Sequence, residues 1–97
     1  CGLAARDALR VEAGLPLSGH ALDAHLSPFA AGIDWAIRKA GDYSGAAAIE
    51  RDRTDSTPRR LVGVRLDAKR LIPVGAAIQA EGRVVGTVTS GVVSPLL

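Results

Sequence analysis

The sequence has few of the residues on which small self-sufficient domains rely. It contains one cysteine, Cys1, among 97 residues, so an internal disulfide is excluded and a reducing compartment is indicated. Its only aromatic residues are Phe29, Trp35 and Tyr43. The hydrophobic share of 47% therefore comes mostly from Ala, Val and Leu, and a chain this short can bury only a modest core. We expect the chain to need contacts with further protein for its stability.

The two ends of the chain point the same way. It opens at Cys1 without an initiator Met, and it closes on the apolar run 94–97. Neither end is typical of a solvated natural terminus. We therefore expect a piece of a larger soluble protein that does not by itself carry a complete active site.

Long apolar runs and an excess of one charge are also lacking. No stretch approaches the roughly 18 apolar residues that a membrane span needs, and no signal peptide is visible. The net charge is only +2, with acids and bases interleaved and no aromatic residues among the basic ones. These features predict no membrane partner and no nucleic-acid partner. They are typical of cytoplasmic protein.

The usual patterns for metal binding and hydrolysis are missing as well. His20 and His25 flank Asp23, but a zinc site needs a third and a fourth ligand, and Cys1 is remote. We interpret these side chains as polar loop residues and expect no metal site. Ser18, His20 and Asp23 are the residue types of a triad, but the nucleophile-elbow pattern is absent, so a hydrolase is not favoured.

No glycine-rich loop of phosphate-binding form links a strand to a helix, so nucleotide binding has no support. Gly86 and Gly91 lie in a β-branched region. We expect them to allow tight backbone packing in a small barrel.

Two helices are predicted in the first half. Apolar residues recur at helical spacing over residues 3–13, and Gly14 with Pro16 supplies a stop. A second helix is predicted from about 45 to 53, with the hydroxyl of Ser44 as its cap.

The remaining segments have weaker or different patterns. Residues 15–28 indicate an irregular connection, and residues 29–37 a short strand or a buried turn. Three strands are predicted over 61–66, 74–80 and 84–89, where β-branched residues are frequent.

Turn-forming residues organise the second half. Glu81 and Gly82 form a plausible two-residue hairpin turn, in which Gly supplies the positive φ. The polar stretch 52–60 predicts a domain boundary. Three strands leave two open edges, which natural proteins rarely tolerate, so we expect more strands in the intact protein.

Arg6 is the most promising binding residue. It and Arg10 are four apart on the first predicted helix, and Asp7 can pair with Arg10, which leaves Arg6 the freer guanidinium. A free Arg beside an apolar face suits a carboxylate, because its planar fork offers two parallel donors. An ordinary solvated helix face explains the same pattern, and the residues alone leave both interpretations open.

Six segments, in order, resemble one known family. Residues 2–14 are similar to the G-L-x-A-R-D-x-L-R-x-E-A-G segment of the glycine-cleavage T-protein, the aminomethyltransferase. Residues 15–20 resemble its segment ending in Y-G-H, and residues 27–37 its T-P-x-x-A-G-L-x-W-x-V stretch. The other three matches are D-F-x-G at 42–45, R-R-L-V-G at 59–63 and V-G-x-V-T-S-G-x-x-S-P at 85–95. Together they cover essentially the whole chain.

The resemblance implies an α+β fragment. Residues 1–55 would be the C-terminal end of a folate-binding α/β domain. Residues 56–97 would be the first strands of a small, incomplete C-terminal antiparallel β-barrel. Arg6 matches the family arginine that helps to hold folate, and no catalytic residue has a counterpart here.

The implied reaction moves a one-carbon unit from aminomethyl-lipoyl H-protein to tetrahydrofolate and releases ammonia. The implied partners are lipoylated H-protein, tetrahydrofolate and the remaining part of the same chain. The location would be cytoplasmic, or the mitochondrial matrix in a eukaryote. The fragment alone is expected to be inactive.

Other readings remain open at this point. A non-catalytic folate-binding relative would bind folate without amine transfer. A folate-dependent demethylase or the folate domain of an amine oxidase would use another donor. A structural or interaction module would pair its exposed strand edges with another chain.

Overall fold

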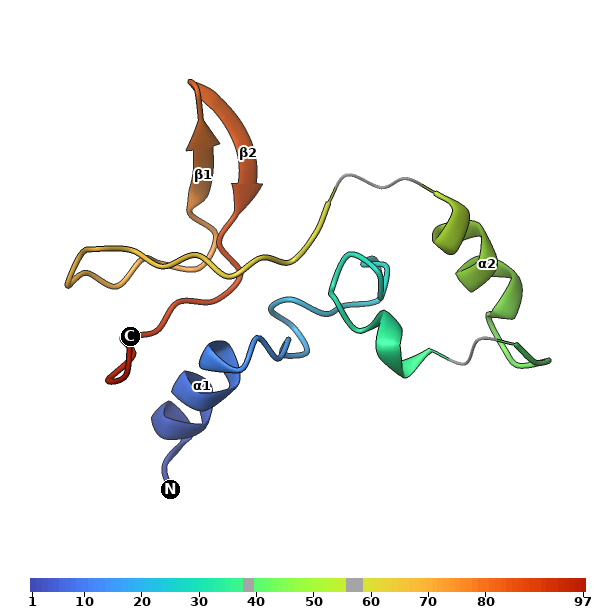
Figure 1. Cartoon of the computed structure of the whole chain (residues 1–97), viewed down its shortest axis with the longest axis horizontal. Helices are drawn as coiled ribbons and strands as arrows, with labels where there is room; N and C mark the ends of the chain where they lie inside the picture. Colours follow the sequence, from blue (N-terminus) through green and yellow to red (C-terminus); the bar gives the residue numbers. More distant parts are fainter. Residues whose placement is uncertain (38–39, 56–58) are drawn as a thin grey trace.

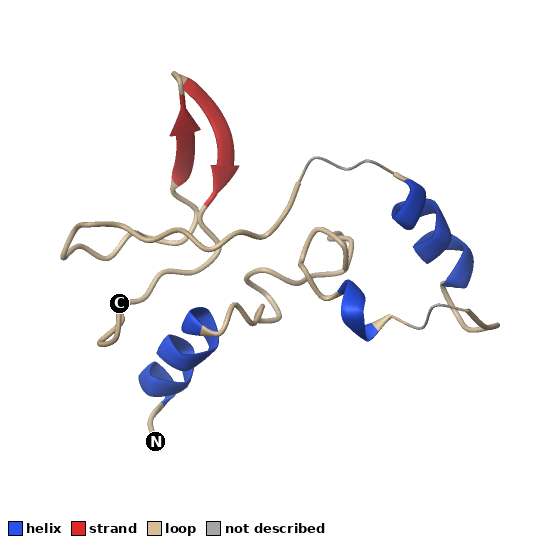
Figure 2. Ribbon diagram, viewed as in Figure 1, coloured by secondary structure: helices blue, strands red, loops and turns tan. Residues whose placement is uncertain are grey.

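The computed structural model describes residues 1–37, 40–55 and 59–97. Within them the chain forms a small α+β arrangement of two α-helices, one 3-10 turn and a two-stranded antiparallel sheet (Figures 1 and 2). The elements, in chain order, are α1 (Leu3–Glu12), η1 (Asp34–Ala36), α2 (Ala46–Thr54), β1 (Ala77–Ala80) and β2 (Arg83–Thr87). Figure 1 shows α1 at the lower left, the hairpin projecting at the upper left and α2 at the right.

Helix α1 confirms the predicted helix to within one residue. It ends in a Schellman motif, in which the Leu15 amide donates to the Arg10 carbonyl at 2.8 Å and the Gly14 amide to the Val11 carbonyl at 3.0 Å. Gly14 has a φ of 71°, the left-handed conformation that this motif needs and that a residue without Cβ adopts at little cost. The predicted stop signal therefore works through a defined hydrogen-bonded cap.

Helix α2 is also confirmed, but its predicted cap is wrong. The N-cap is Gly45 with a φ of 87°, and no side chain caps the helix. With this backbone at Gly45, Ser44 lies outside the helix and its hydroxyl does not serve the first amides. Arg53 instead anchors the helix sideways, with its guanidinium carbon 5.6 Å from the centroid of the Phe29 ring.

Residues 15–28 form an irregular connection, as predicted. It is built of turns with one isolated bridge between Ser18 and Leu22. Of the two possibilities for residues 29–37, the strand is wrong, because this segment forms turns and η1. It is also not a buried turn throughout, since Trp35 is 77% exposed.

Strands β1 and β2 form a hairpin around the predicted turn. Ala80 pairs with Arg83, which leaves Glu81 (φ 52°) and Gly82 (φ 78°) as the two turn residues, both in the left-handed conformation of a type I′ turn. The register shifts between Ile78 and Gln79, so the ladder contains an irregularity.

The hairpin ladder continues beyond the assigned strands. The amide of Val88 donates to Ala76 at 2.9 Å, and the amide of Gly75 donates to the Val88 carbonyl at 2.8 Å. The predicted strands 74–80 and 84–89 are therefore right in place and pairing. The first prediction starts three residues too early, and the second starts one residue late and ends two residues late.

The strand predicted over residues 61–66 is wrong. This segment forms no strand, and all of its residues are exposed. Leu61 donates its amide to the Ala30 carbonyl at 2.8 Å. The segment has the β-branched pattern of a strand, but no strand in the described part of the chain pairs with it, and a strand is stable only when a neighbour satisfies its backbone groups.

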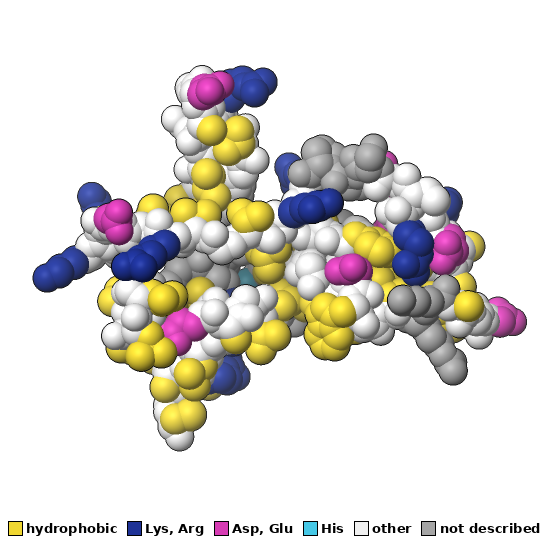
Figure 3. All heavy atoms as spheres, viewed as in Figure 1, with side chains coloured by type: hydrophobic (Ala, Val, Ile, Leu, Met, Phe, Trp, Pro, Cys, Tyr) yellow, Lys and Arg dark blue, Asp and Glu magenta, His cyan; other side chains and the backbone are white. Residues whose placement is uncertain are grey.

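Little of the described chain is buried. Ala21 and Ala31 are its only buried hydrophobic residues, at 5% and 3% exposure, and no large side chain is fully buried. The radius of gyration is 15.6 Å, whereas a compact domain of about 100 residues has roughly 13 Å. Figure 3 shows apolar side chains at the surface over much of the visible face. This openness agrees with the expectation of a modest core.

The predicted division between residues 55 and 56 falls at residues 56–58, which lie outside the described residues. Among the helices that the structure describes, none has the length and apolar character to cross a bilayer.

Candidate functional site

On the charged face of α1, Asp7 and Arg10 form an ion pair between adjacent turns of the helix. The Nε of Arg10 donates to Oδ1 of Asp7 at 2.6 Å, and Nη2 of Arg10 lies 2.5 Å from the same oxygen. The predicted i, i+3 pair between these residues is thus confirmed. The Arg10 side chain is only 12% exposed, so this pair is better shielded from water than a typical surface ion pair.

Arg10 also reaches the far end of the chain. Its Nη1 donates to Oγ of Ser90 at 2.8 Å, a contact between residues 80 apart in sequence. Two residues after Arg10, Oε1 of Glu12 accepts a hydrogen bond from the hydroxyl of Ser94. The same Ser94 oxygen accepts the amides of Leu96 and Leu97, each at 3.1 Å, and so orders the last residues of the chain.

A third contact comes from the loop after α1. Nδ1 of His20 lies 3.3 Å from the carbonyl oxygen of Thr89, to which it donates in the tautomer protonated at Nδ1. We call these three contacts, Arg10–Ser90, Glu12–Ser94 and His20–Thr89, the polar junction. Figure 1 shows the C-terminal segment running back towards α1.

Sequence reasoning did not find the polar junction. Its members are 69 to 82 residues apart, and no local periodicity pairs residues over such a distance. The signal that was present is the resemblance itself, because the members of the junction lie in the matched segments 2–14, 15–20 and 85–95.

Arg6, the predicted folate contact, lies one turn before Arg10 on α1. It is exposed, and among the described residues its guanidinium makes no ion pair and no side-chain hydrogen bond. Its backbone amide donates to the Gly2 carbonyl at 3.2 Å, within the first turn. The difference predicted between the two arginines is therefore present: Arg10 is held by Asp7 and Ser90, whereas the Arg6 guanidinium has no such partner among the described residues.

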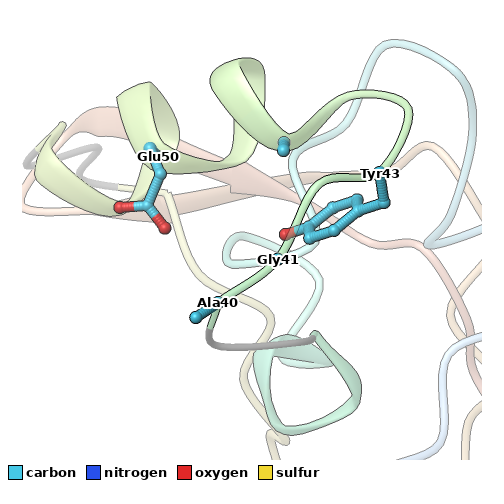
Figure 4. A pocket seen from close by; sticks show the side chains of 5 residues that line it. Ala40, Gly41, Tyr43 and Glu50 are labelled. Atoms are coloured by element: carbon cyan, nitrogen blue, oxygen red, sulfur yellow. The ribbon is translucent and has the colours of Figure 1, made fainter.

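Two open hollows lie beside α2. One, of about 300 Å³, is lined by Tyr43 and Glu50 with Ala40, Gly41 and Ala46 (Figure 4). A second, of about 400 Å³, lies around Phe29 and Arg53. Neither includes Arg6 or a member of the polar junction, so the hollows and the predicted binding residue are separate features.

No metal site is formed by the described residues, in which no three His, Cys, Asp or Glu side chains gather to hold an ion. His20 contacts Thr89, and the Asp23 carboxylate accepts the His25 amide at 2.7 Å. These side chains have roles in the loop structure.

Comparison with known proteins agrees with the pattern of motifs. Residues 59–97 match the glycine cleavage T-protein C-terminal barrel domain. The whole chain is 37% identical to an aminomethyltransferase of Nostoc and 44% identical to one of Streptomyces coelicolor. An aminomethyltransferase of Thermosipho melanesiensis is 40% identical over 99% of the chain. No solved structure matches.

The extent of these matches is uneven. The chain spans about a quarter of the length of the curated relatives it matches, 26% for the Nostoc protein and 27% for the Streptomyces protein. Three findings agree with one another: the matched motifs, the hairpin in the barrel-domain region, and the similarity over the full length of this chain. The chain is therefore similar over its whole length to aminomethyltransferases, and its residues 59–97 match the C-terminal barrel domain of the glycine cleavage T-protein family.

Proposed function

We propose that this chain is part of a tetrahydrofolate-dependent aminomethyltransferase of glycine cleavage. In this proposal residues 1–55 complete the folate-binding domain and residues 56–97 begin the C-terminal barrel. The observation that carries the proposal is the similarity of the whole chain to aminomethyltransferases, which supports the same activity for the protein that contains it.

The proposed reaction transfers the aminomethyl carbon from the lipoyl arm of H-protein to tetrahydrofolate, with release of ammonia. Arg6 is the residue of this chain that we assign to tetrahydrofolate. Its exposed guanidinium without a partner supports this role, since the glutamate tail of folate carries carboxylates and a guanidinium offers them two parallel donors. We assign no catalytic residue to the chain, and we expect the 97 residues alone to be inactive.

Arg6→Ala tests the assignment in the intact protein. We expect the affinity for tetrahydrofolate to fall by about 1–3 kcal/mol, the range for hydrogen bonds to charged groups. Titration calorimetry measures the change. Arg51→Ala is the matched control, because Arg51 is also an exposed helical arginine and its side chain makes no hydrogen bond or ion pair with the described residues. Equal affinities of the Arg6 variant and the native protein would remove Arg6 from the site.

Turnover with lipoylated H-protein then separates the proposed enzyme from its alternatives. Ammonia release that depends on both H-protein and tetrahydrofolate is the expected result. Folate binding without turnover would instead indicate a non-catalytic relative, and turnover with a methylated amine as donor would indicate a demethylase. An absence of folate binding would favour an interaction module.

A further inference from the structure

The two arginines of α1 have opposite environments although they are one turn apart. Arg10 is bound on one side by Asp7 and on the other by Ser90, whereas Arg6 is exposed and unpaired within the described residues. Residues four apart lie on the same helix face, separated by about 6 Å along the axis. The position of the Arg6 backbone is therefore set by whatever holds Arg10.

Polar contacts, more than apolar packing, hold α1 in place. Leu3 and Leu9 on this helix are 74% and 61% exposed, and α1 has no buried residue. Among the described residues, the side-chain hydrogen bonds that join α1 to the second half of the chain are Arg10–Ser90 and Glu12–Ser94. Hydrogen bonds require defined distances and angles, so they orient a helix more narrowly than non-directional apolar contacts do.

We propose that Arg10 and Ser90 are positioning residues for the folate carboxylate: they fix α1 on the segment 89–94 and so aim Arg6. This inference rests on the proposed function and adds to it two residues that do not touch the ligand. The same contacts keep Arg10 from competing for the anion, because its guanidinium is already occupied by Asp7 and Ser90. Its charge is also compensated, which lessens its repulsion of Arg6.

The test is Ser90→Ala in the intact protein, because this change removes the Arg10–Ser90 bond and leaves both arginines and Asp7 in place. Ser90→Thr keeps the hydroxyl and serves as the conservative variant. Ser44→Ala is the matched control, since Ser44 is an exposed serine that caps no helix. Two probes are titrated: tetrahydrofolate, and its diamide, in which both glutamate carboxylates are neutral.

We expect Ser90→Ala to weaken tetrahydrofolate binding about three- to tenfold, the effect of losing one hydrogen bond. Binding of the diamide should be unchanged, because Arg6 has no charged partner in it. Ser90→Thr and Ser44→Ala should bind both probes as the native protein does. Arg10→Lys is a second variant, which retains a charge beside Asp7 but cannot span both partners, and it should show the same selective loss.

Three outcomes overturn the proposal. An unchanged affinity for tetrahydrofolate in both Ser90→Ala and Arg10→Lys shows that the bond does not aim Arg6. An equal loss for tetrahydrofolate and the diamide shows a general structural effect in place of positioning. If the native protein binds neither probe, both the proposed function and the positioning role are wrong. This outcome differs from the other two because the titration of the native protein itself shows no binding.

Discussion

At Gly91 the backbone of a neighbouring segment comes too close for any side chain. A Cβ added there would lie 2.9 Å from the carbonyl oxygen of Ile72, a distance that Cβ atoms essentially never adopt. The expectation that Gly91 allows tight backbone packing is confirmed. The same expectation for Gly86 is weaker, because a Cβ there would make ordinary contact with Ile78 at 3.7 Å. Two glycines in one β-branched region thus have different constraints.

This difference gives a paired prediction. Gly91→Ala should lower the free energy of unfolding by about 1–3 kcal/mol, because the methyl group forces the two segments apart. Gly86→Ala should change it by less than half as much, since the added methyl fits beside Ile78. Urea unfolding of both variants in the intact protein, followed by circular dichroism, measures the two effects. Equal losses would contradict the assigned role of the Ile72 carbonyl.

Each half of the chain contains an element that ends or turns where the local sequence predicts it. Helix α1 ends where Gly14 caps it, and the hairpin turns where Ala80 pairs with Arg83. The hairpin turn contains one unfavourable feature. Glu81 has a φ of 52°, and this left-handed conformation raises the energy of a residue that has a Cβ. Type I′ turns favour Asn followed by Gly at these two positions.

Glu81→Asn should therefore stabilise the hairpin, by about 0.5–1 kcal/mol, because Asn tolerates the left-handed conformation better than Glu. Glu81→Gln is the control, since it removes the charge as Asn does and keeps the longer side chain. Amide hydrogen exchange at Val88 and Gly75, which bond across the extended ladder, reports the change. Similar protection in the Asn and Gln variants would mean that charge, and not backbone conformation, is responsible.

At the scale of the whole molecule, the chain is open and rests on few buried side chains. Many large apolar side chains stay exposed, among them Val62 at 67% and Val64 at 64%. A strand with this pattern needs a partner strand, and within the described residues none is present. The exposed segment is consistent with the proposal that further protein completes the barrel.

Small-angle scattering on the 97-residue chain tests this openness. We expect a radius of gyration of 15.6 Å or more, because too little apolar surface is buried to hold the chain compact. A value near 13 Å, typical of a compact domain of about this length, would show that the chain collapses onto itself and would contradict the arrangement described above.

The sequence by itself determined the features that depend on neighbours along the chain. These are α1 with its Gly14 cap, the extent of α2, the Asp7–Arg10 pair and the turn at Glu81 and Gly82. Each involves residues at most a few positions apart, so spacing and side-chain chemistry were enough to predict it. The family was also recognisable, because its motifs occur in order along the chain.

Only the tertiary structure decided how the distant segments meet. It joined Arg10 to Ser90 and Glu12 to Ser94, it left residues 61–66 without a strand partner, and it placed the Ile72 carbonyl against Gly91. The physical reason is the same in each case. Such contacts depend on which backbone groups and side chains approach across the fold, and a pattern of neighbouring residues carries no information about a partner that lies 80 positions away.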